Sequence, residues 1–335
     1  MPFMPWQTRL YLYYRCKGFG PQEGIALLMV LWVLAILMVI VLSFSFMVKT
    51  DTLSTLSFKG GMERKSIAEA GIERGIMELH YRSAFKDQTV ELEGTGVWKT
   101  DGTPYTGQLG NGRYTVRLTD ESGKVDINTA SGLVLKNLLL NMGVQAEEAD
   151  TIVDSIMDWK DVDNLHRLHG AESDYYMSLP NPYKAKDALF DTVEELLLVK
   201  GVTSEILYGS KDRKGVINLL TVNAKMDRIN VNAATKEVLM AIPNMTPEIA
   251  EAIISYRQNK EITDMQEIEG IIGTSDSAMS QYISTGGTNM FTIDSSGSKE
   301  NEKGIYTIRA TVMVATGTDE PHTFVYYKSP LGLKQ

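Results

Sequence analysis

The feature that most constrains this chain is its apolar run at residues 25–48. The run reads IALLMVLWVLAILMVIVLSFSFMV, carries no charge, and has only Ser43 and Ser45 as polar side chains. A helix of this length would reach roughly 36 Å, which exceeds the roughly 30 Å hydrocarbon core of a bilayer. Basic residues precede the run, so a single-pass anchor with a cytoplasmic amino terminus is expected. A cleavable secretory signal is not expected, because its apolar core is shorter and ends at a small-residue cleavage site.

Composition limits the function of the rest of the chain. Its 335 residues suffice for two domains, and the net charge is −9. The first 24 residues carry three basic and one acidic side chain, so the remainder carries −11. Such a charge disfavours binding to a phosphate backbone. Cys16 is the single cysteine, which excludes an internal disulfide and a cysteine-ligated zinc site.

The residues at the start of the apolar run resemble a known processing signal. The segment Gly24-Ile25-Ala26-Leu27-Leu28-Met29 is similar to the leader of type IV prepilins. The resemblance implies that prepilin peptidase cuts between Gly24 and Ile25, and that Ile25 becomes the N-methylated first residue. Most members carry Glu where this chain has Met29. Within the family that absence is typical of the K class of minor pseudopilins, in type II secretion systems.

Beyond the run, apolar residues follow one helical face from 66 to 79. That face comprises Ile67, Ala68, Ile72, Ile76 and Leu79. The membrane helix should therefore continue as an amphipathic helix, with a break or kink expected at Gly60-Gly61. Residues 87–111 are expected to be a loop, and residues 113–118 alternate as a half-buried strand does.

A second β region is expected near the carboxyl end. Residues 305–314 alternate over ten positions, and 291–294 and 323–328 are shorter strand candidates. A long helix on a small antiparallel sheet is the pilin architecture. About 170 residues separate the first strand from the others, and their periodicity is helical. The sequence thus predicts a helical domain inserted within the sheet.

The predicted insert contains an internal repeat. Asp126-Ile127-Asn128-Thr129-Ala130 and its following helices align with Asn230-Val231-Asn232-Ala233-Ala234 at an offset of 104 residues. Each copy predicts two helices, the second beginning near Gln145 or Thr246. The unit resembles the helix-hairpin-helix motif, and residues 229–257 are similar to competence-type DNA-binding modules.

That resemblance raises a DNA-binding alternative. Functional hairpins of the motif bring backbone N–H groups of a Gly-rich turn against phosphates. Here the second turn has no glycine, and Gly143 in the first is followed by acidic residues, among them Glu147 and Glu148. We therefore interpret the repeat as structural and expect no nucleic-acid partner.

A cluster of carboxylates is the main candidate for a bound ion. Asp154 and Asp158 would share a helical face, and Asp161 and Asp163 would lie in the loop that follows, with Glu172 nearby. Such residues can bind calcium, although the spacing is not that of an EF-hand. The alternative is that Asp161 and Asp163 are loop and capping residues. His166 and His169 are interpreted as surface imidazoles, and no catalytic motif is present, so an enzyme is not expected.

The same region resembles the core of the K minor pseudopilins (general secretion protein K). The similar segments are Asp158-Trp159-Lys160-Asp161-Val162-Asp163, residues 170–176, Asn181-Pro182-Tyr183-Lys184-Ala185-Lys186 and residues 194–201. In that family Trp159, Tyr176, Pro182 and Tyr183 would be scaffold. Some members bind calcium, which directs attention to Asp158, Asp161, Asp163 and Glu172.

The resemblance implies an α+β fold with a pilin-like long N-terminal helix on a small antiparallel sheet. A large inserted all-α domain would contain two helix-hairpin-helix-like repeats. The expected divisions are a leader at 1–24, a transmembrane helix at 25–48, its continuation and first strand at 49–120, the insert at 121–284 and the last strands at 285–335.

The implied function is that of a minor pseudopilin at the tip of the type II secretion pseudopilus. It would be anchored in the bacterial inner membrane, with its globular region in the periplasm and other minor pseudopilins as partners. The alternatives are a membrane-anchored DNA-uptake protein and a minor type IV pilin.

Overall fold

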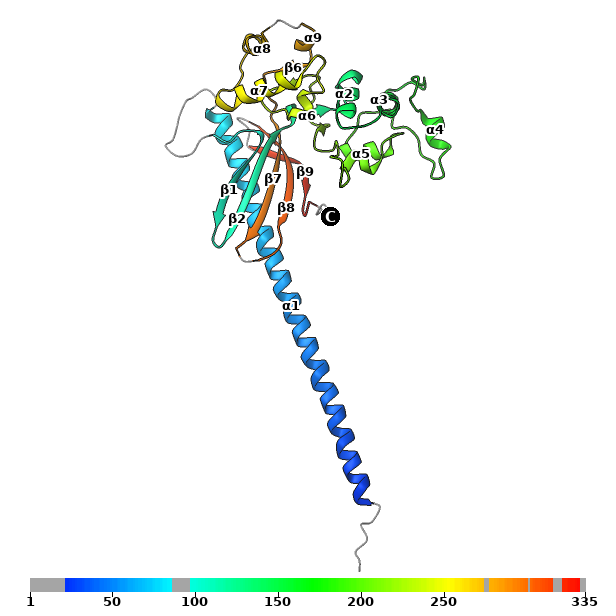
Figure 1. The fold of residues 1–335 in the computed structure, drawn as a ribbon, viewed down its shortest axis with the longest axis vertical. Helices are drawn as coiled ribbons and strands as arrows, with labels where there is room; N and C mark the ends of the chain where they lie inside the picture. Colours follow the sequence, from blue (N-terminus) through cyan, green and yellow to red (C-terminus); the bar gives the residue numbers. More distant parts are fainter. Residues whose placement is uncertain (1–21, 86–96, 274–276, 301, 316–320, 332–335) are drawn as a thin grey trace, which may run out of the picture. The chain divides into compact units, whose positions relative to one another are not determined.

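The computed structural model describes residues 22–85, 97–273, 277–300, 302–315 and 321–331 (Figure 1). The chain divides into two compact units, residues 1–61 and 62–335.

Within the described residues, the first unit is the amino-terminal part of helix α1, which spans Gln22–Phe85. Among the described residues, α1 is the one helix that is both long enough and apolar enough to cross a membrane. Its side chains are exposed from residue 25 to residue 59. The helix assignment continues through Gly60 and Gly61, so the break expected there is wrong. Two glycines do not outweigh the hydrogen bonds and tertiary packing that stabilise the helix around them.

The second unit contains a five-stranded antiparallel sheet with the order β1-β2-β7-β8-β9. Its strands are β1 (Asp101–Leu109), β2 (Gly112–Asp120), β7 (Met290–Lys299), β8 (Tyr306–Val314) and β9 (His322–Lys328). The loop expected at 87–111 is wrong for residues 101–109, which form β1, and its residues 87–96 lie outside the described part of the chain. β1 is an edge strand with no fully buried residue, and its sequence DGTPYTGQL lacks the alternation of apolar and polar residues that reveals a strand.

The carboxyl-terminal part of α1 packs on this sheet. All five residues of its predicted apolar face are buried, and most of them contact inward-facing residues such as Val116, Ile293 and Ile308. Gly71 makes this approach close, because a Cβ at this position would overlap the Ser295 hydroxyl and lie 3.0 Å from Val116. At Gly75 a Cβ would lie 2.9 Å from Ile293.

Between β2 and β7 lies the helical insert, whose core is separate from that of the sheet. Its longer helices are α2 (Gly132–Asn141), α3 (Ala146–Lys160), α7 (Pro247–Asn259) and α8 (Met265–Ile272). Its short helices are η1 (Glu121–Gly123), α4 (Ser173–Met177), η2 (Val193–Leu198), α5 (Ser204–Tyr208), α6 (Lys236–Leu239) and α9 (Ser277–Ser280).

Each copy of the repeat also contains a short parallel strand pair that the sequence did not reveal. β3 (Val125–Asp126) pairs with β4 (Leu220–Thr221), and β5 (Ile229–Asn230) pairs with β6 (Ile283–Ser284). Strands of two residues are too short to show a period of two. The first helices of the copies, α2 and α6, are in contact, and Asn137 in α2 donates through Nδ2 to the carbonyl of Ala241, two residues after α6, at 3.1 Å.

A buried polar junction joins the insert to the sheet. Asp120 ends β2, and its Oδ1 accepts hydrogen bonds from the Ser122 hydroxyl at 2.6 Å and the Thr288 hydroxyl at 2.9 Å. Ser122 begins the insert and Thr288 precedes β7, so one carboxylate holds the outgoing and the returning chain together.

Candidate metal centre

The predicted carboxylates lie where α3 ends and the chain loops toward α4. Helix α3 buries an apolar face that includes Ile152, Ile156 and Trp159, and it ends at Lys160. Asp161 and Asp163 are therefore in the loop beyond it, as the sequence predicts. Glu172 is the residue that immediately precedes α4.

Two of the acidic residues anchor this loop to α3. The backbone N–H of His169 donates to Asp154 at 3.0 Å, and the Arg167 N–H donates to Asp158 at 3.2 Å. The Arg167 guanidinium also pairs with Asp158 at 2.5 Å and with Asp161 at 2.6 Å. Asp158 is fully buried and neutralised by Arg167, so it serves as a loop anchor.

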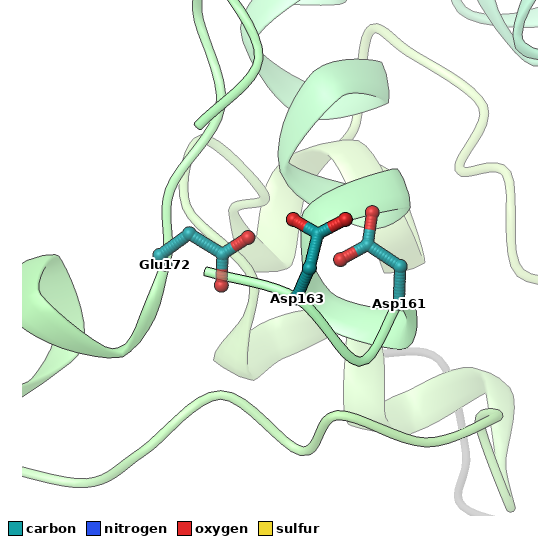
Figure 2. A group of neighbouring side chains, drawn as sticks. All are labelled: Asp161, Asp163 and Glu172. Atoms are coloured by element: carbon teal, nitrogen blue, oxygen red, sulfur yellow. The ribbon is translucent and has the colours of Figure 1, made fainter. Parts of the chain in front are cut away.

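Asp161, Asp163 and Glu172 form a carboxylate cluster, in which one oxygen from each lies within 4.8 Å of the others. Figure 2 shows Asp161 and Asp163 side by side on the loop, with Glu172 facing them from the segment before α4. Of the four predicted ligands, the structure brings these three together. Asp158 and Asp161 both pair with Arg167, but Asp158 is not part of the cluster.

Glu172 is the least satisfied member of this carboxylate cluster. Its side chain is 2% exposed, and neither of its oxygens has a hydrogen-bond partner. One oxygen of Asp161 is likewise buried without a partner. Burial raises the pKa of Glu172, and the negative charges of Asp158, Asp161 and Asp187 act in the same direction, so that the pKa reaches about 7. A buried carboxylate without a partner is costly unless it is protonated or binds a cation.

The carboxylate cluster fits a hard divalent cation. Calcium prefers six to eight oxygen ligands, and carboxylates are its usual protein donors. Asp187, which directly follows the 181–186 motif, was not identified from the sequence. Its negative charge acts on Glu172 in the structure. Asp187 also has a φ of +52°, which holds the chain in a left-handed turn, and its N–H donates to the Trp159 carbonyl at 3.1 Å.

Aromatic packing positions both sides of the cluster. Trp159 and Tyr176 are buried and meet edge to face at 5.1 Å between ring centroids. Trp159 donates to Glu195 at 3.1 Å, and the Tyr176 hydroxyl accepts the Lys200 N–H at 3.2 Å. Tyr183 is half-buried against them, and Pro182 is exposed in the irregular segment after α4.

The outer surface of the loop combines polar and apolar side chains. The His166 imidazole lies 3.0 Å from Asp174, and His169 is exposed, in agreement with their interpretation as surface residues. Val162, Leu165 and Leu168 are 83%, 76% and 89% exposed, which is unusual for aliphatic side chains in an ordered loop.

The hairpin turns of the two repeats match each other in backbone conformation. Gly143 in the first copy has a φ of +82°, and Asn244 in the second has a φ of +64°. The helices that follow begin with Glu147 and Glu148 in one copy and Glu248 in the other. These acidic helix starts complement the helix dipole and would repel phosphate.

The processing residues lie at the start of α1. Ile25 and Met29 are 51% and 64% exposed. Residues 1–21, most of the predicted leader, lie outside the described part of the chain.

Comparisons with known proteins place these features in a family. Residues 115–209 match the family model "Type II secretion system (T2SS), protein K", and residues 224–282 match "Helix-hairpin-helix motif". The chain is 27% identical over 254 residues to the type II secretion system protein K of Pectobacterium carotovorum, an alignment that covers 70% of this chain and 75% of the relative. It is 26% identical over 259 residues to that of Pseudomonas aeruginosa, covering 70% and 72%.

A solved structure has the same fold at 16% identity. It is described as the GspK-GspI-GspJ complex from the enterotoxigenic Escherichia coli Type 2 Secretion System, and the match covers 83% of this chain and 98% of that chain with a TM-score of 0.55. The family-model match, the relatives and the helix, sheet and helical insert agree with one another. This chain belongs to the type II secretion system protein K family and is a minor pseudopilin of the K class.

Proposed function

We propose that this chain lies at the tip of a type II secretion pseudopilus, where it helps to initiate pseudopilus assembly and protein export across the outer membrane. The observation that carries the proposal is the helical insert between β2 and β7, which a filament subunit stacked above it would have to avoid. Met29 supports the same position. By the family resemblance, a glutamate there would bind the amino terminus of the subunit above, and a tip subunit has no such neighbour.

The proposed assembly buries the apolar surface of α1. Beyond the membrane-length run, Leu53, Leu56, Phe58 and Met62 are 46–72% exposed. Apolar side chains so close together indicate a surface that a partner covers. Helices of other minor pseudopilins are the proposed partners, and the solved complex of a related fold supports this choice. The anchor would be in the inner membrane, with residues 62–335 in the periplasm.

Co-expression tests the partner proposal. The full chain, produced with candidate minor pseudopilins of the same secretion system and extracted in detergent, should purify as a stable hetero-oligomer. Phe58→Asp should weaken that complex, and Ser57→Asp, which adds the same charge at the neighbouring exposed position, should weaken it less. A strictly monomeric chain in every mixture would contradict the proposal.

Labelling tests the position in the filament. An epitope inserted at the exposed turn Lys211-Asp212 should be detected by immunogold microscopy at one end of sheared pseudopili. Removal of the chain should reduce the number of pseudopili formed. Label along the whole filament would contradict a tip position.

The acidic hairpins do not favour the DNA-uptake alternative. A phosphate-binding hairpin needs free backbone N–H groups and basic side chains at the start of its second helix. Here those positions hold Glu147 and Glu148 in one copy and Glu248 in the other. A minor type IV pilin shares the leader and the helix, so the genes that accompany this chain distinguish the two functions.

A second proposal concerns the carboxylate cluster, which we propose binds calcium. Asp161, Asp163 and Glu172 would hold the ion, and its positive charge would neutralise Glu172 and connect the loop after α3 to the segment before α4. The unpartnered, buried carboxylate of Glu172 supports this. Calorimetric titration of chelator-treated protein with CaCl₂ should give saturable binding, with MgCl₂ binding more weakly. No heat above the buffer blank would contradict it.

A further inference from the structure

A cavity of about 570 Å³ lies where the sheet meets the second repeat. It is within the size range of small-ligand sites. The end of α1, the start of β1, the end of α7 and the segment before β7 form its walls. The apolar side chains of its lining are those of Leu79, Val97, Phe291, Val314 and Ala315. The rest is polar and contains four basic side chains, in a chain whose net charge is negative.

Arg257 is a basic wall residue without an acidic partner. One of its terminal nitrogens donates to the carbonyls of Val231 at 2.5 Å and Ala234 at 2.7 Å. Its Nε is buried without a hydrogen-bond partner. Burial lowers the pKa of Arg257, and the negative charge of Asp101 opposes this shift. This guanidinium forms no ion pair with another described residue, so its positive charge is only partly compensated.

Lys99 is the second such cation. Its Nζ donates at 2.7 Å to the carbonyl of Gln258, the residue that follows Arg257. Among the residues described, this Nζ has no carboxylate partner. The other two basic wall residues are paired. Arg82 contacts Glu261 at 3.0 Å and Lys260 contacts Glu267 at 3.0 Å.

The acidic wall residues are already engaged. Asp101 accepts from the N–H and hydroxyl of Thr103 at 3.0 and 2.6 Å. Asp120 belongs to the polar junction, and Glu261 pairs with Arg82. The cavity therefore presents two cations that form no ion pair with another described residue, beside an apolar patch.

We infer that this cavity binds a carboxylate attached to an apolar group. The carboxylate would lie against Arg257 and Lys99, and the apolar group would lie on Phe291 and Val314. Carboxylates form the strongest hydrogen bonds to guanidinium and ammonium groups, and the cost of burying Arg257 decreases when its charge is matched. The carboxyl terminus of a polypeptide and a free organic acid share this chemistry.

The test uses the full chain in detergent micelles and isothermal titration at low salt. The probes are acetyl-Gly-Leu with a free carboxylate, the same dipeptide as its carboxyl amide, and isocaproate. Saturable binding of the free-acid dipeptide, with the amide weaker by about tenfold or more, supports the inference. If isocaproate binds as well as the dipeptide, the ligand is a free organic acid. If the dipeptide binds better, it is a chain terminus.

Variants locate the binding. Lys99→Met should weaken binding of the free acid by about tenfold, because one charge-assisted hydrogen bond is lost. Lys214→Met is the matched control, since its side chain is 80% exposed and outside the cavity. Arg257→Gln would also remove the two hydrogen bonds to the Val231 and Ala234 carbonyls that hold the repeat together. Lys99→Met is therefore the variant that tests the site. Equal binding of acid and amide, no saturable binding, or equal affinity of Lys99→Met and the control would overturn the inference.

Discussion

At the scale of single residues, Glu172 combines deep burial, negative neighbours and unpartnered oxygens. A group in that position must acquire either a proton or a cation. Protonation leaves the loop after α3 held by its other contacts, among them the Arg167 ion pairs and the Lys200 bonds to the His169 and Gly170 carbonyls. A cation would add a direct connection between Glu172 and the loop. The two states should therefore differ in measurable stability.

Glu172→Gln should remove the stabilisation by calcium. In wild-type protein, free calcium at about 100 times its dissociation constant should add about 2.7 kcal/mol to the free energy of unfolding. The variant should show little of this gain, and without calcium it should be no less stable, because the amide removes repulsion from Asp158 and Asp161. Thermal unfolding with calcium or with chelator measures both effects. Asp174→Asn, at an exposed position nearby, should keep the full gain; loss of the gain there too would argue against the assigned ligands.

The pH dependence of the calcium-free protein follows from the same residue. The pKa of Glu172 is raised from 4.5 to about 7 on folding. The native state then binds more protons than the unfolded state between these values, so the contribution of Glu172 is present below pH 4.5 and is lost as the pH rises through about 7. In chelator, the denaturation midpoint of the wild type should fall relative to that of Glu172→Gln between pH 5 and pH 8. Parallel profiles would show that Glu172 titrates as an exposed carboxyl does.

At the scale of elements, the close contact between α1 and the sheet depends on glycines in α1, which have no side chain to separate the two. Gly71→Ala would place a Cβ against the Ser295 hydroxyl and Val116, and we expect a loss of about 1–3 kcal/mol in the free energy of unfolding. Gly270→Ala is the matched control, because it is helical in α8 and has no atom within 4 Å of its added Cβ. It should gain up to about 1 kcal/mol from helix propensity. Chemical denaturation of both variants measures the difference, and equal stability would mean that α1 lies farther from the sheet.

Elements with a strong period were predictable from the sequence, and elements without one were not. The buried face of α1 at Ile67–Leu79 and the alternation in β8 follow directly from apolar spacing. Edge strand β1 contains Pro104 and Gly107 and has no buried face, so nothing in its composition distinguished it from a loop. The candidate site was predictable to the extent that its residues are close in sequence. Asp187 reaches it through a chain reversal that spacing does not reveal, and the pairing of Asp158 with Arg167 depends on the loop's path.

At the scale of the whole molecule, the sequence separates two environments. Residues 25–48 carry no charge, and the chain after residue 24 carries −11 in total, so all of that charge belongs to residues 49–335. In the proposed function, which follows the family resemblance, the anchor enters a filament only after its amino terminus is processed. The proposed function therefore depends on the bond between Gly24 and Ile25.

The mass of the membrane-extracted protein tests this bond. Co-expression with prepilin peptidase should remove residues 1–24 and add one methyl group at Ile25, because the cut is expected on the cytoplasmic side of a retained helix. Without the peptidase the full 335 residues should remain. Gly24→Leu should block the cut, since the family signal ends in glycine, and Gly18→Leu, within the predicted leader and away from the junction, should not. A full-length chain in the presence of active peptidase would leave a single-pass anchor that cannot enter the pseudopilus in the proposed way.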